Sequence, residues 1–365
     1  MRTCPGATRR DARVNAKVKE TVLGTIQSGF PIAPDPYGTL ADQLGLERDE
    51  VEKALLDLRE EGLVRRIGAS FDSKRLGYSS TLCALAVPPE RADEVAAIIN
   101  AYPGVTHNYL RENRYNIWFT LITRSSEDRA RILGQIVEQS GCGDLLDMPA
   151  TKMYKIRVDF GKGHGKKAAG AQTKPKGAGG HAAAGHPGAT AADARAFDGD
   201  DAFDVALVRW AQDDVVFDAD GTLVERPFEQ GAALIARQIG REVTEDEVID
   251  RILELKALKV IRRFGAMVKH QKMGFAFNGM TVWNVDDGRL DEVGAAFAEK
   301  PYVSHCYTRL AKPTWPYKIY AMTHAQTQDE LDGYVAELAE IAQTEPLVLV
   351  STKEYKKVSM RYFEE

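Results

Sequence analysis

The spacing of apolar residues predicts three short helices and then a strand near the start of the chain. Val18, Val22 and Ile26 recur at helical spacing, and a second helical pattern follows Pro36. A third helical pattern has Val51, Leu55, Leu56 and Leu58 on its apolar side. A β-rich Gly-Leu-Val-Arg-Arg-Ile-Gly segment follows it. Three helices followed by a β-rich wing are typical of a winged helix-turn-helix, which we place at residues 13–72.

After the wing, the pattern alternates between the periods of strands and helices. The order is strand, helix, strand, strand, helix, strand, which predicts a ferredoxin-like βαββαβ domain over residues 78–160. The expected segments are Thr81–Val87, Pro89–Ala101, Val105–Arg111, Tyr115–Thr123, Ser125–Gln139 and Met148–Val158.

The second half of the chain repeats the first. Arg65-Arg66-Ile67-Gly68-Ala69 returns 197 positions later as Arg262-Arg263-Phe264-Gly265-Ala266. The second copy, residues 201–365, predicts a less regular winged helix-turn-helix at 201–268 and a ferredoxin-like domain at 275–365. The expected segments of that domain are Asn278–Val285, Asp287–Glu299, Val303–Arg309, Tyr317–Thr323, Thr327–Ala342 and Leu347–Met360. The predicted fold class is therefore α+β, a tandem repeat of both domains, with the two sheets pairing with each other.

A segment of different composition separates the two copies. Between residues 161 and 200, Gly and Ala occupy 22 of 40 positions, too little apolar surface to offset the chain entropy of folding. We interpret 161–200 as a flexible Gly/Ala linker. It holds His164, His181 and His186, for which weak metal binding is the alternative to a biased spacer.

Composition excludes several classes of protein. No run of about 18 apolar residues occurs, which argues against a membrane helix, and residues 1–17 lack the apolar core of a secretory signal. The chain has 365 residues, a net charge of −5 and four cysteines with no C-x-x-C pair. These cysteines predict neither a disulfide framework nor a metal site, and a reducing cytoplasm is the expected location.

The predicted recognition helices do not favour DNA as a partner. Residues 45–61 contain seven acidic and three basic residues, and residues 240–256 contain six acidic and three basic residues. Such helices would be repelled by phosphates, although the Arg pairs of the two wings partly offset this charge.

Two predicted strands carry matching polar residues. Because side chains alternate along a strand, every second residue shares a face. The residues that share a face are His107, Tyr109 and Arg111 on the first strand, and His305, Tyr307 and Arg309 on the second. Imidazole, phenol and guanidinium groups together indicate a binding surface, and a polar sheet face at a domain interface is the alternative.

These motifs resemble a known family. A winged helix followed by a ferredoxin-like domain resembles the AsnC/Lrp transcription factors. His107-Asn108-Tyr109-x-Arg111 with Tyr115-Asn116-Ile117-Trp118-Phe119-Thr120 is similar to the sirohaem decarboxylase branch of that family. His305-Cys306-Tyr307-x-Arg309 with Trp315-Pro316-Tyr317 and Met322-Thr323-His324 resembles the partner subunit of that enzyme.

The resemblance implies a fusion of two subunits and a function. The family removes CO₂ from two acetate side chains of sirohaem to give 12,18-didecarboxysirohaem, on routes to haem b or haem d1. The expected partner is sirohaem, and no cofactor or protein-bound metal is expected beyond the iron of that substrate. A ligand-responsive transcription regulator is the alternative, and a tetrapyrrole carrier without turnover is a third.

A polycarboxylate macrocycle sets the expected roles of the site residues. Arginines bind carboxylates with a charge that they cannot lose, and aromatic side chains contact a flat ring. The expected substrate-binding residues are Arg111, Arg114, Arg263, Arg309, Tyr109, Tyr307, Trp118, Trp315 and Tyr317, with Met322 as a pliable contact. Surface ion pairs and ordinary core packing are the alternative roles for these residues.

Histidines are the candidates for proton delivery to the new methyl group. His305 and His107 are the first choices and His324 the second, and an axial ligand to the substrate iron is the alternative role. The first copy has no counterpart of His324 or of Trp315-Pro316, which predicts one main site richer in second-copy residues. The sequence leaves open whether there are one or two sites, which acetate leaves first, and which haem the product serves.

Overall fold

The computed structural model describes residues 15–156, 194–268 and 277–364. Most of the expected 161–200 linker lies outside the described residues, as do His164, His181, His186 and His270. No helix in the described ranges is long and apolar enough to cross a membrane.

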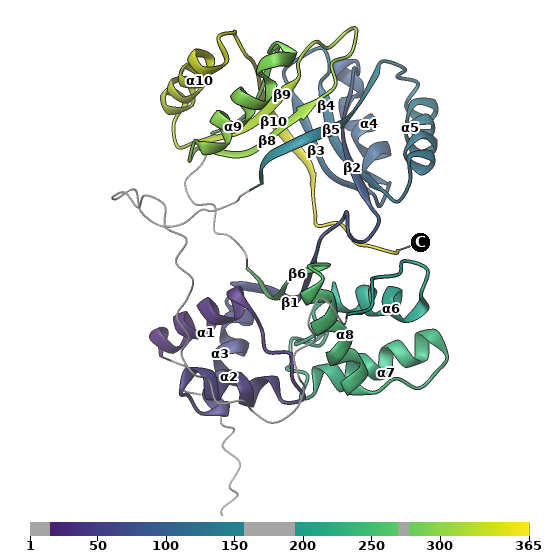
Figure 1. The fold of residues 1–365 in the computed structure, drawn as a ribbon, viewed down its shortest axis with the longest axis vertical. Helices are drawn as coiled ribbons and strands as arrows, with labels where there is room; N and C mark the ends of the chain where they lie inside the picture. Colours follow the sequence, from purple (N-terminus) through teal and green to yellow (C-terminus); the bar gives the residue numbers. More distant parts are fainter. Residues whose placement is uncertain (1–14, 157–193, 269–276, 365) are drawn as a thin grey trace, which may run out of the picture. The chain divides into compact units, whose positions relative to one another are not determined.

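The chain forms two compact units that combine like parts of the two sequence copies (Figure 1). The unit we call the winged-helix unit falls within residues 1–78, 186–271 and 361–365. The unit we call the barrel unit falls within residues 79–185 and 272–360. Each copy therefore contributes to both units.

The winged-helix unit contains two sets of three helices. They are α1 (Ala16–Ser28), α2 (Pro36–Leu44) and α3 (Arg48–Glu60), and α6 (Ala202–Ala211), α7 (Pro227–Ile239) and α8 (Glu245–Ala257). Local sequence fixes several of the helix starts: the Asp35 carboxylate accepts the Gly38 N–H at the start of α2, and Thr244 accepts the Glu247 N–H at the start of α8.

The wing strand of each copy pairs with its equivalent. Strand β1 (Val64–Phe71) pairs antiparallel with β6 (Ile261–Val268), and Gly68 lies opposite Gly265. A Cβ atom at either glycine would clash with a backbone oxygen, that of Asp213 for the first and that of Ile26 for the second. The close approach of these backbones explains the glycine in the repeated Arg-Arg-x-Gly-Ala motif.

The barrel unit contains two βαββαβ domains, which confirms the predicted fold. The first has β2 (Ser79–Leu85), α4 (Ala92–Asn100), β3 (Val105–Arg111), β4 (Ile117–Thr123), α5 (Ser126–Ser140) and β5 (Leu145–Ile156). The second has β7 (Phe277–Trp283), α9 (Leu290–Glu299), β8 (Val303–Arg309), β9 (Ile319–Ala325), α10 (Gln328–Ala342) and β10 (Leu347–Lys357). Short 3-10 turns, η1 (Pro89–Arg91) and η2 (Asp287–Arg289), precede α4 and α9.

Two long strands close the sheets into one barrel, ordered β10-β3-β4-β2-β5-β8-β9-β7. The first part of β5 pairs with β2, and its second part pairs with β8 of the other domain. Strand β10 does the same with β7 and β3. The two sheets thus pair with each other, as the sequence analysis expected.

Apolar side chains pack on both faces of this barrel. Cores that include Phe119 and Phe297 lie on the faces covered by helices, with α4 and α5 outside one sheet and α9 and α10 outside the other (Figure 1). A third cluster, containing Trp118, Trp315 and Tyr320, lies between the two sheets. The inner faces of β3 and β8 therefore point toward a mixed aromatic and polar interior.

Candidate functional site

Two equivalent strands, β3 and β8, present the predicted polar residues to the barrel interior. The alternate residues face the helices instead: Asn108 donates to Asn100 Oδ1 at 3.0 Å, and Cys306 Sγ lies 3.7 Å from the Gly294 carbonyl. We call His107, Tyr109 and Arg111 the first triad, and His305, Tyr307 and Arg309 the second triad.

The two triads have nearly the same internal geometry. In each, the imidazole and phenol rings are stacked with centroids 6.4 Å apart, at interplanar angles of 30° in the first triad and 19° in the second. The guanidinium carbon lies over the phenol ring at 5.6 Å in the first and 5.4 Å in the second. The sequence repeat therefore produces a repeated arrangement of side chains, and not only a repeated fold.

Each triad ends in a guanidinium without a carboxylate partner among the described residues. Arg111 is only 4% exposed, and its Nη1 donates to the Leu349 carbonyl at 2.5 Å. Arg309 makes the equivalent bond to the Met148 carbonyl, and the Nε of each arginine has no hydrogen-bond partner. Burial lowers the pKa of Arg111 to about 10 and also lowers that of Arg309. A buried cation in this state favours an anionic ligand, and a carboxylate matches its geometry.

The structure brings the three candidate histidines within electrostatic reach of one another. Burial lowers the pKa of His107, and the charges of Lys357 and His305 lower it further, with an opposing effect of Glu354. Burial lowers the pKa of His324 to about 4, with contributions from His305 and Lys357. The pKa of His305 is also lowered by burial. Imidazoles from both copies are therefore close enough for the charge of one to affect another, and burial favours their neutral forms.

A threonine or serine hydroxyl lies within hydrogen-bond distance of one ring nitrogen of each of these imidazoles. His107 Nδ1 lies 3.0 Å from Thr106 Oγ1, and His305 Nδ1 lies 2.8 Å from Ser304 Oγ. The same Ser304 oxygen lies 2.6 Å from His324 Nε2. The sequence analysis missed these two residues, although the signal was present as a hydroxyl residue before the histidine in both copies.

Strand β10 adds two charged residues that the sequence analysis also missed. Glu354 lies opposite Tyr109, and Lys357 lies opposite His107, in the β10–β3 register. Burial and Glu354 together raise the pKa of Tyr109 to about 12. The residue opposite Tyr307 is Met153, so the two triads differ in their cross-strand neighbours. Only the register of β10 against β3 shows that these residues lie beside the first triad, and that register was not predictable from the sequence.

The predicted aromatic residues lie together in the cluster between the sheets. Trp118 is 1% exposed and Trp315 is 4% exposed, with ring centroids 5.4 Å apart. Their indole N–H groups donate to the Tyr115 carbonyl and, at 2.8 Å, to the Tyr320 hydroxyl. Tyr317 packs on Trp315 at 4.8 Å. These residues pack as core side chains, and they do so on the same interior side as the triads.

Two of the predicted arginines lie elsewhere. Arg114 is exposed and pairs with Asp144 at 2.6 Å. Arg263 belongs to the winged-helix unit, where it donates to the Gln27 carbonyl at 2.6 Å. The structure therefore directs the two triad arginines to strand carbonyls of the barrel and places Arg114 and Arg263 elsewhere.

The winged-helix unit has a cavity of about 590 Å³ beside α7 and α8. Its walls include Arg226, Glu229, Glu245 and Asp246, and Arg226 pairs with the first two of these carboxylates. An acidic lining with its cation already paired does not suit a polycarboxylate ligand.

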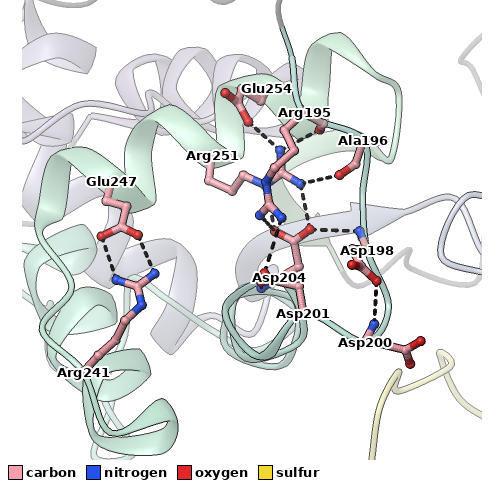
Figure 2. A network of polar contacts seen from close by, with 10 residues as sticks. All are labelled: Arg195, Ala196, Asp198, Asp200, Asp201, Asp204, Arg241, Glu247, Arg251 and Glu254. Carbon is pink, nitrogen blue, oxygen red and sulfur yellow. Dashed lines mark hydrogen bonds and ion pairs between the residues drawn. The ribbon is translucent and has the colours of Figure 1, made fainter.

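Two of the three basic residues in the second recognition-helix segment, residues 240–256, form ion pairs within the protein. Figure 2 shows Arg251 on α8 bonded to Asp204, Glu254 and the Ala196 carbonyl, with Arg241 paired with Glu247 nearby. The Arg251 and Asp204 side chains are 4% and 0% exposed. The buried Arg251 is therefore held by internal carboxylates, whereas Arg241 forms an exposed ion pair.

Comparisons with known proteins identify the family. Residues 75–155 and 272–356 match the AsnC-like ligand binding domain, and residues 19–65 match the siroheme decarboxylase NirDL-like HTH domain. The chain is 30% identical over 353 residues to the siroheme decarboxylase of Hydrogenobacter thermophilus, covering 95% of both chains. The chain belongs to the sirohaem decarboxylase family.

Other relatives show how this chain is organised within the family. It is 32% identical to the siroheme decarboxylase NirDL subunit of Paracoccus denitrificans, over 92% of this chain and 94% of the relative. It is 50% identical to the siroheme decarboxylase alpha subunit of Desulfovibrio desulfuricans, over 38% of this chain and 80% of the relative. The chain is therefore the fused form of proteins that also occur as separate subunits.

Solved structures agree with this assignment. The crystal structure of the siroheme decarboxylase NirDL superposes with a TM-score of 0.70 at 27% identity, over 95% of each chain. A second structure, of that enzyme in co-complex with an iron-uroporphyrin III analogue, superposes with a TM-score of 0.69.

Proposed function

We propose that this chain is a carboxy-lyase that removes CO₂ from two acetate side chains of sirohaem. The single observation that carries the proposal is the pair of inward-facing triads, each with a buried guanidinium that has no carboxylate partner in the part of the chain that the structure describes. The family relationship names the reaction, and the triads supply side chains that suit its substrate. The product would be 12,18-didecarboxysirohaem, for haem b or haem d1 synthesis.

Arg111 and Arg309 would bind carboxylates of the substrate. Each is fixed by one bond to a strand carbonyl and keeps an Nε donor that has no partner among residues 15–156, 194–268 and 277–364. A carboxylate would satisfy those donors and offset the buried charge. Carboxylates held in this way would position the macrocycle, and binding energy from remote groups can hold a reactive acetate in place. Lys357, next to His107 in register, would add positive charge at the other end of the first triad.

The chemical step is the exchange of CO₂ for a proton. The bond between the methylene carbon and the carboxylate breaks, and its electron pair stays on the methylene carbon beside the conjugated ring. A proton from an imidazole then completes the methyl group. No electron sink other than the macrocycle is needed, which is why the proposal includes no organic cofactor.

Protonation of the imidazoles would depend on the substrate itself. The lowered pKa values of His107 and His305 favour their neutral forms before the substrate binds. Substrate carboxylates would raise the pKa values of the histidines near them, because a nearby negative charge favours the imidazolium. We therefore infer that binding takes up protons within the histidine cluster, and that these protons allow His305 and His107 to act as acids. Axial ligation of the substrate iron is the alternative role for one of them.

One shared site accounts for the arrangement better than two. The His305 charge acts on both His107 and His324, and only the second copy supplies the third imidazole. The site would therefore be asymmetric, because the second triad has an additional imidazole beside it and the first has none among the described residues.

The remaining features argue for an enzyme in the cytoplasm and against an operator-binding regulator. Arg251 and Arg241 are occupied by internal carboxylates, which leaves α8 poorly suited to DNA. The described cysteines, Cys83, Cys142 and Cys306, are free and buried, as in proteins of reducing compartments.

Anaerobic incubation with sirohaem, followed by mass spectrometry, tests the function. Loss of two CO₂ per macrocycle is the expected result. A shift of the Soret band without a change of mass would support a carrier instead. Binding to a defined duplex with a steep salt dependence would support a regulator.

A further inference from the structure

A buried serine joins two of the three histidines. Ser304 on β8 is 7% exposed, and its Oγ lies 2.8 Å from His305 Nδ1 and 2.6 Å from His324 Nε2. A hydroxyl group has one proton to donate and two lone pairs to accept with. Ser304 can therefore donate to one imidazole while it accepts from the other, which is the geometry of a chain for proton transfer. Within the described residues, His305 Nε2 makes no hydrogen bond.

The first copy has the hydroxyl but not the second imidazole. Thr106 Oγ1 lies 3.0 Å from His107 Nδ1. The position equivalent to His324 is Ile122, since Ile122 lies opposite β2 as His324 lies opposite β7. The sequence of three hydrogen-bonding groups, His305, Ser304 and His324, is thus present in the second copy. In the first copy, His107 has the hydroxyl neighbour and no second imidazole at the equivalent position.

We propose that Ser304 and His324 form a proton relay behind His305. This inference rests on the proposed function, and it assigns both as positioning residues. In the loaded site, His324 is an imidazolium that donates through Nε2 to Ser304, and Ser304 donates to Nδ1 of a neutral His305. His305 gives its Nε2 proton to the methylene carbon that has lost CO₂. The serine proton moves to His305 Nδ1, and the His324 proton moves to the serine oxygen. One C–H bond forms, and His324 becomes neutral.

The charges around the relay make it responsive to the substrate. Lys357 on β10 is a cation near the relay, and His107 on β3 can become one. Glu354 on β10 is a carboxylate, and its charge acts in the opposite direction. Tyr307 stacks on His305 from the same strand. With these neighbours and burial, a protonated His324 is disfavoured until a polyanion enters. The relay would therefore be loaded with a proton when the substrate binds.

Ser304→Ala in the full chain tests the relay, with Ser304→Thr as the rescue variant and Ser140→Ala as the matched control, because Ser140 is a buried serine on α5, outside the barrel interior. In anaerobic single turnovers with sirohaem, we expect Ser304→Ala to slow one of the two CO₂ losses by about tenfold or more, so that a monodecarboxylated intermediate accumulates. Ser304→Thr should restore the rate, and Ser140→Ala should leave both losses within about threefold of wild type. Ser304→Ala combined with His324→Gln should be no slower than the slower single variant, because both changes interrupt one path.

A second readout does not depend on turnover. Nitrogen NMR of histidine-labelled full chain reports the tautomer of each imidazole. Ser304→Ala should change the signals of two histidines, and Thr106→Val should change those of one. Changes confined to one histidine in Ser304→Ala would overturn the relay.

The outcomes separate the relay from the proposed function. If the wild-type chain releases CO₂ from sirohaem but Ser304→Ala matches it, or if Ser140→Ala slows the reaction equally, the relay is wrong and the function stands. If the wild-type chain releases no CO₂, the proposed function fails, and the relay fails with it.

Discussion

Arg111→Met should leave the stability of the protein nearly unchanged and greatly weaken binding of a polycarboxylate tetrapyrrole. Methionine retains much of the apolar length of arginine and removes its charge. An arginine kept for stability would behave in the opposite way, with a large loss of unfolding free energy and little effect on the ligand.

The magnitude follows from two opposing contributions. Arg111 is 4% exposed and its pKa is lowered to about 10 by burial, so keeping it charged costs the fold roughly 3 kcal/mol at about 1.4 kcal/mol per pKa unit. Its bond to the Leu349 carbonyl returns about 1.5–3 kcal/mol, the usual range for a charged donor. The two nearly cancel, which predicts a change in the free energy of unfolding within about 1 kcal/mol. Loss of a buried, charge-assisted carboxylate contact should weaken binding by about 2–5 kcal/mol.

Urea unfolding and a Soret-band titration with an iron-uroporphyrin measure the two quantities. Arg114→Met is the matched control, because Arg114 is exposed and paired with Asp144; it should change stability and binding by less than about 1 kcal/mol each. A destabilisation of Arg111→Met by more than about 3 kcal/mol with unchanged ligand affinity would refute the assignment of Arg111 as a carboxylate anchor.

Three further predictions concern single residues. Burial lowers the pKa of His324 to about 4, so between pH 4 and the ordinary histidine pKa the unfolded chain binds more protons than the folded chain. The free energy of unfolding should therefore fall as the pH falls through this range, and His324→Gln should reduce that dependence on pH, measured by urea unfolding. An unchanged pH dependence would contradict the assignment. Arg251→Met leaves the buried Asp204 without its main partner and should lower the free energy of unfolding by about 3–5 kcal/mol. The control Arg241→Met removes an exposed ion pair and should lower it by less than about 1 kcal/mol. Equal effects of the two variants would count against a buried ion pair. Trp315→Ala should lower it by about 3–5 kcal/mol in the same assay, and a change below about 1 kcal/mol would argue that Trp315 is not a core residue.

The repeated fold was predictable because local pattern encodes it. The strand and helix order of each βαββαβ domain follows from hydrophobic period, and the duplicated Arg-Arg-x-Gly-Ala motif sets the repeat. The β1–β6 pairing was not predictable, because neither copy alone indicates that its wing strand pairs with the other copy. The barrel closure had one local signal, the unusual length of β5 and β10.

The site was predictable where strand alternation decides it. His107, Tyr109 and Arg111 share a face because their spacing is two, and the same holds for the second triad. Glu354 and Lys357 depend on the register of β10 against β3, which contains bulges. Ser304 was missed because regular alternation would place it on the opposite face from His305. A register shift between Val303 and His305 interrupts that alternation, and the Ser304 hydroxyl lies beside both His305 and His324. The roles assigned to the individual residues stay predictions.

The central claim is that the two triads together bind and protonate a polycarboxylate macrocycle. The most direct test is the rate of CO₂ loss from sirohaem under anaerobic conditions, followed by mass spectrometry, for the wild-type chain and for His107→Gln and His305→Gln. The account predicts two CO₂ lost by the wild type and a rate reduced by about 10²-fold or more in at least one variant. Wild-type rates in both variants, or no CO₂ loss by the wild type, would contradict it.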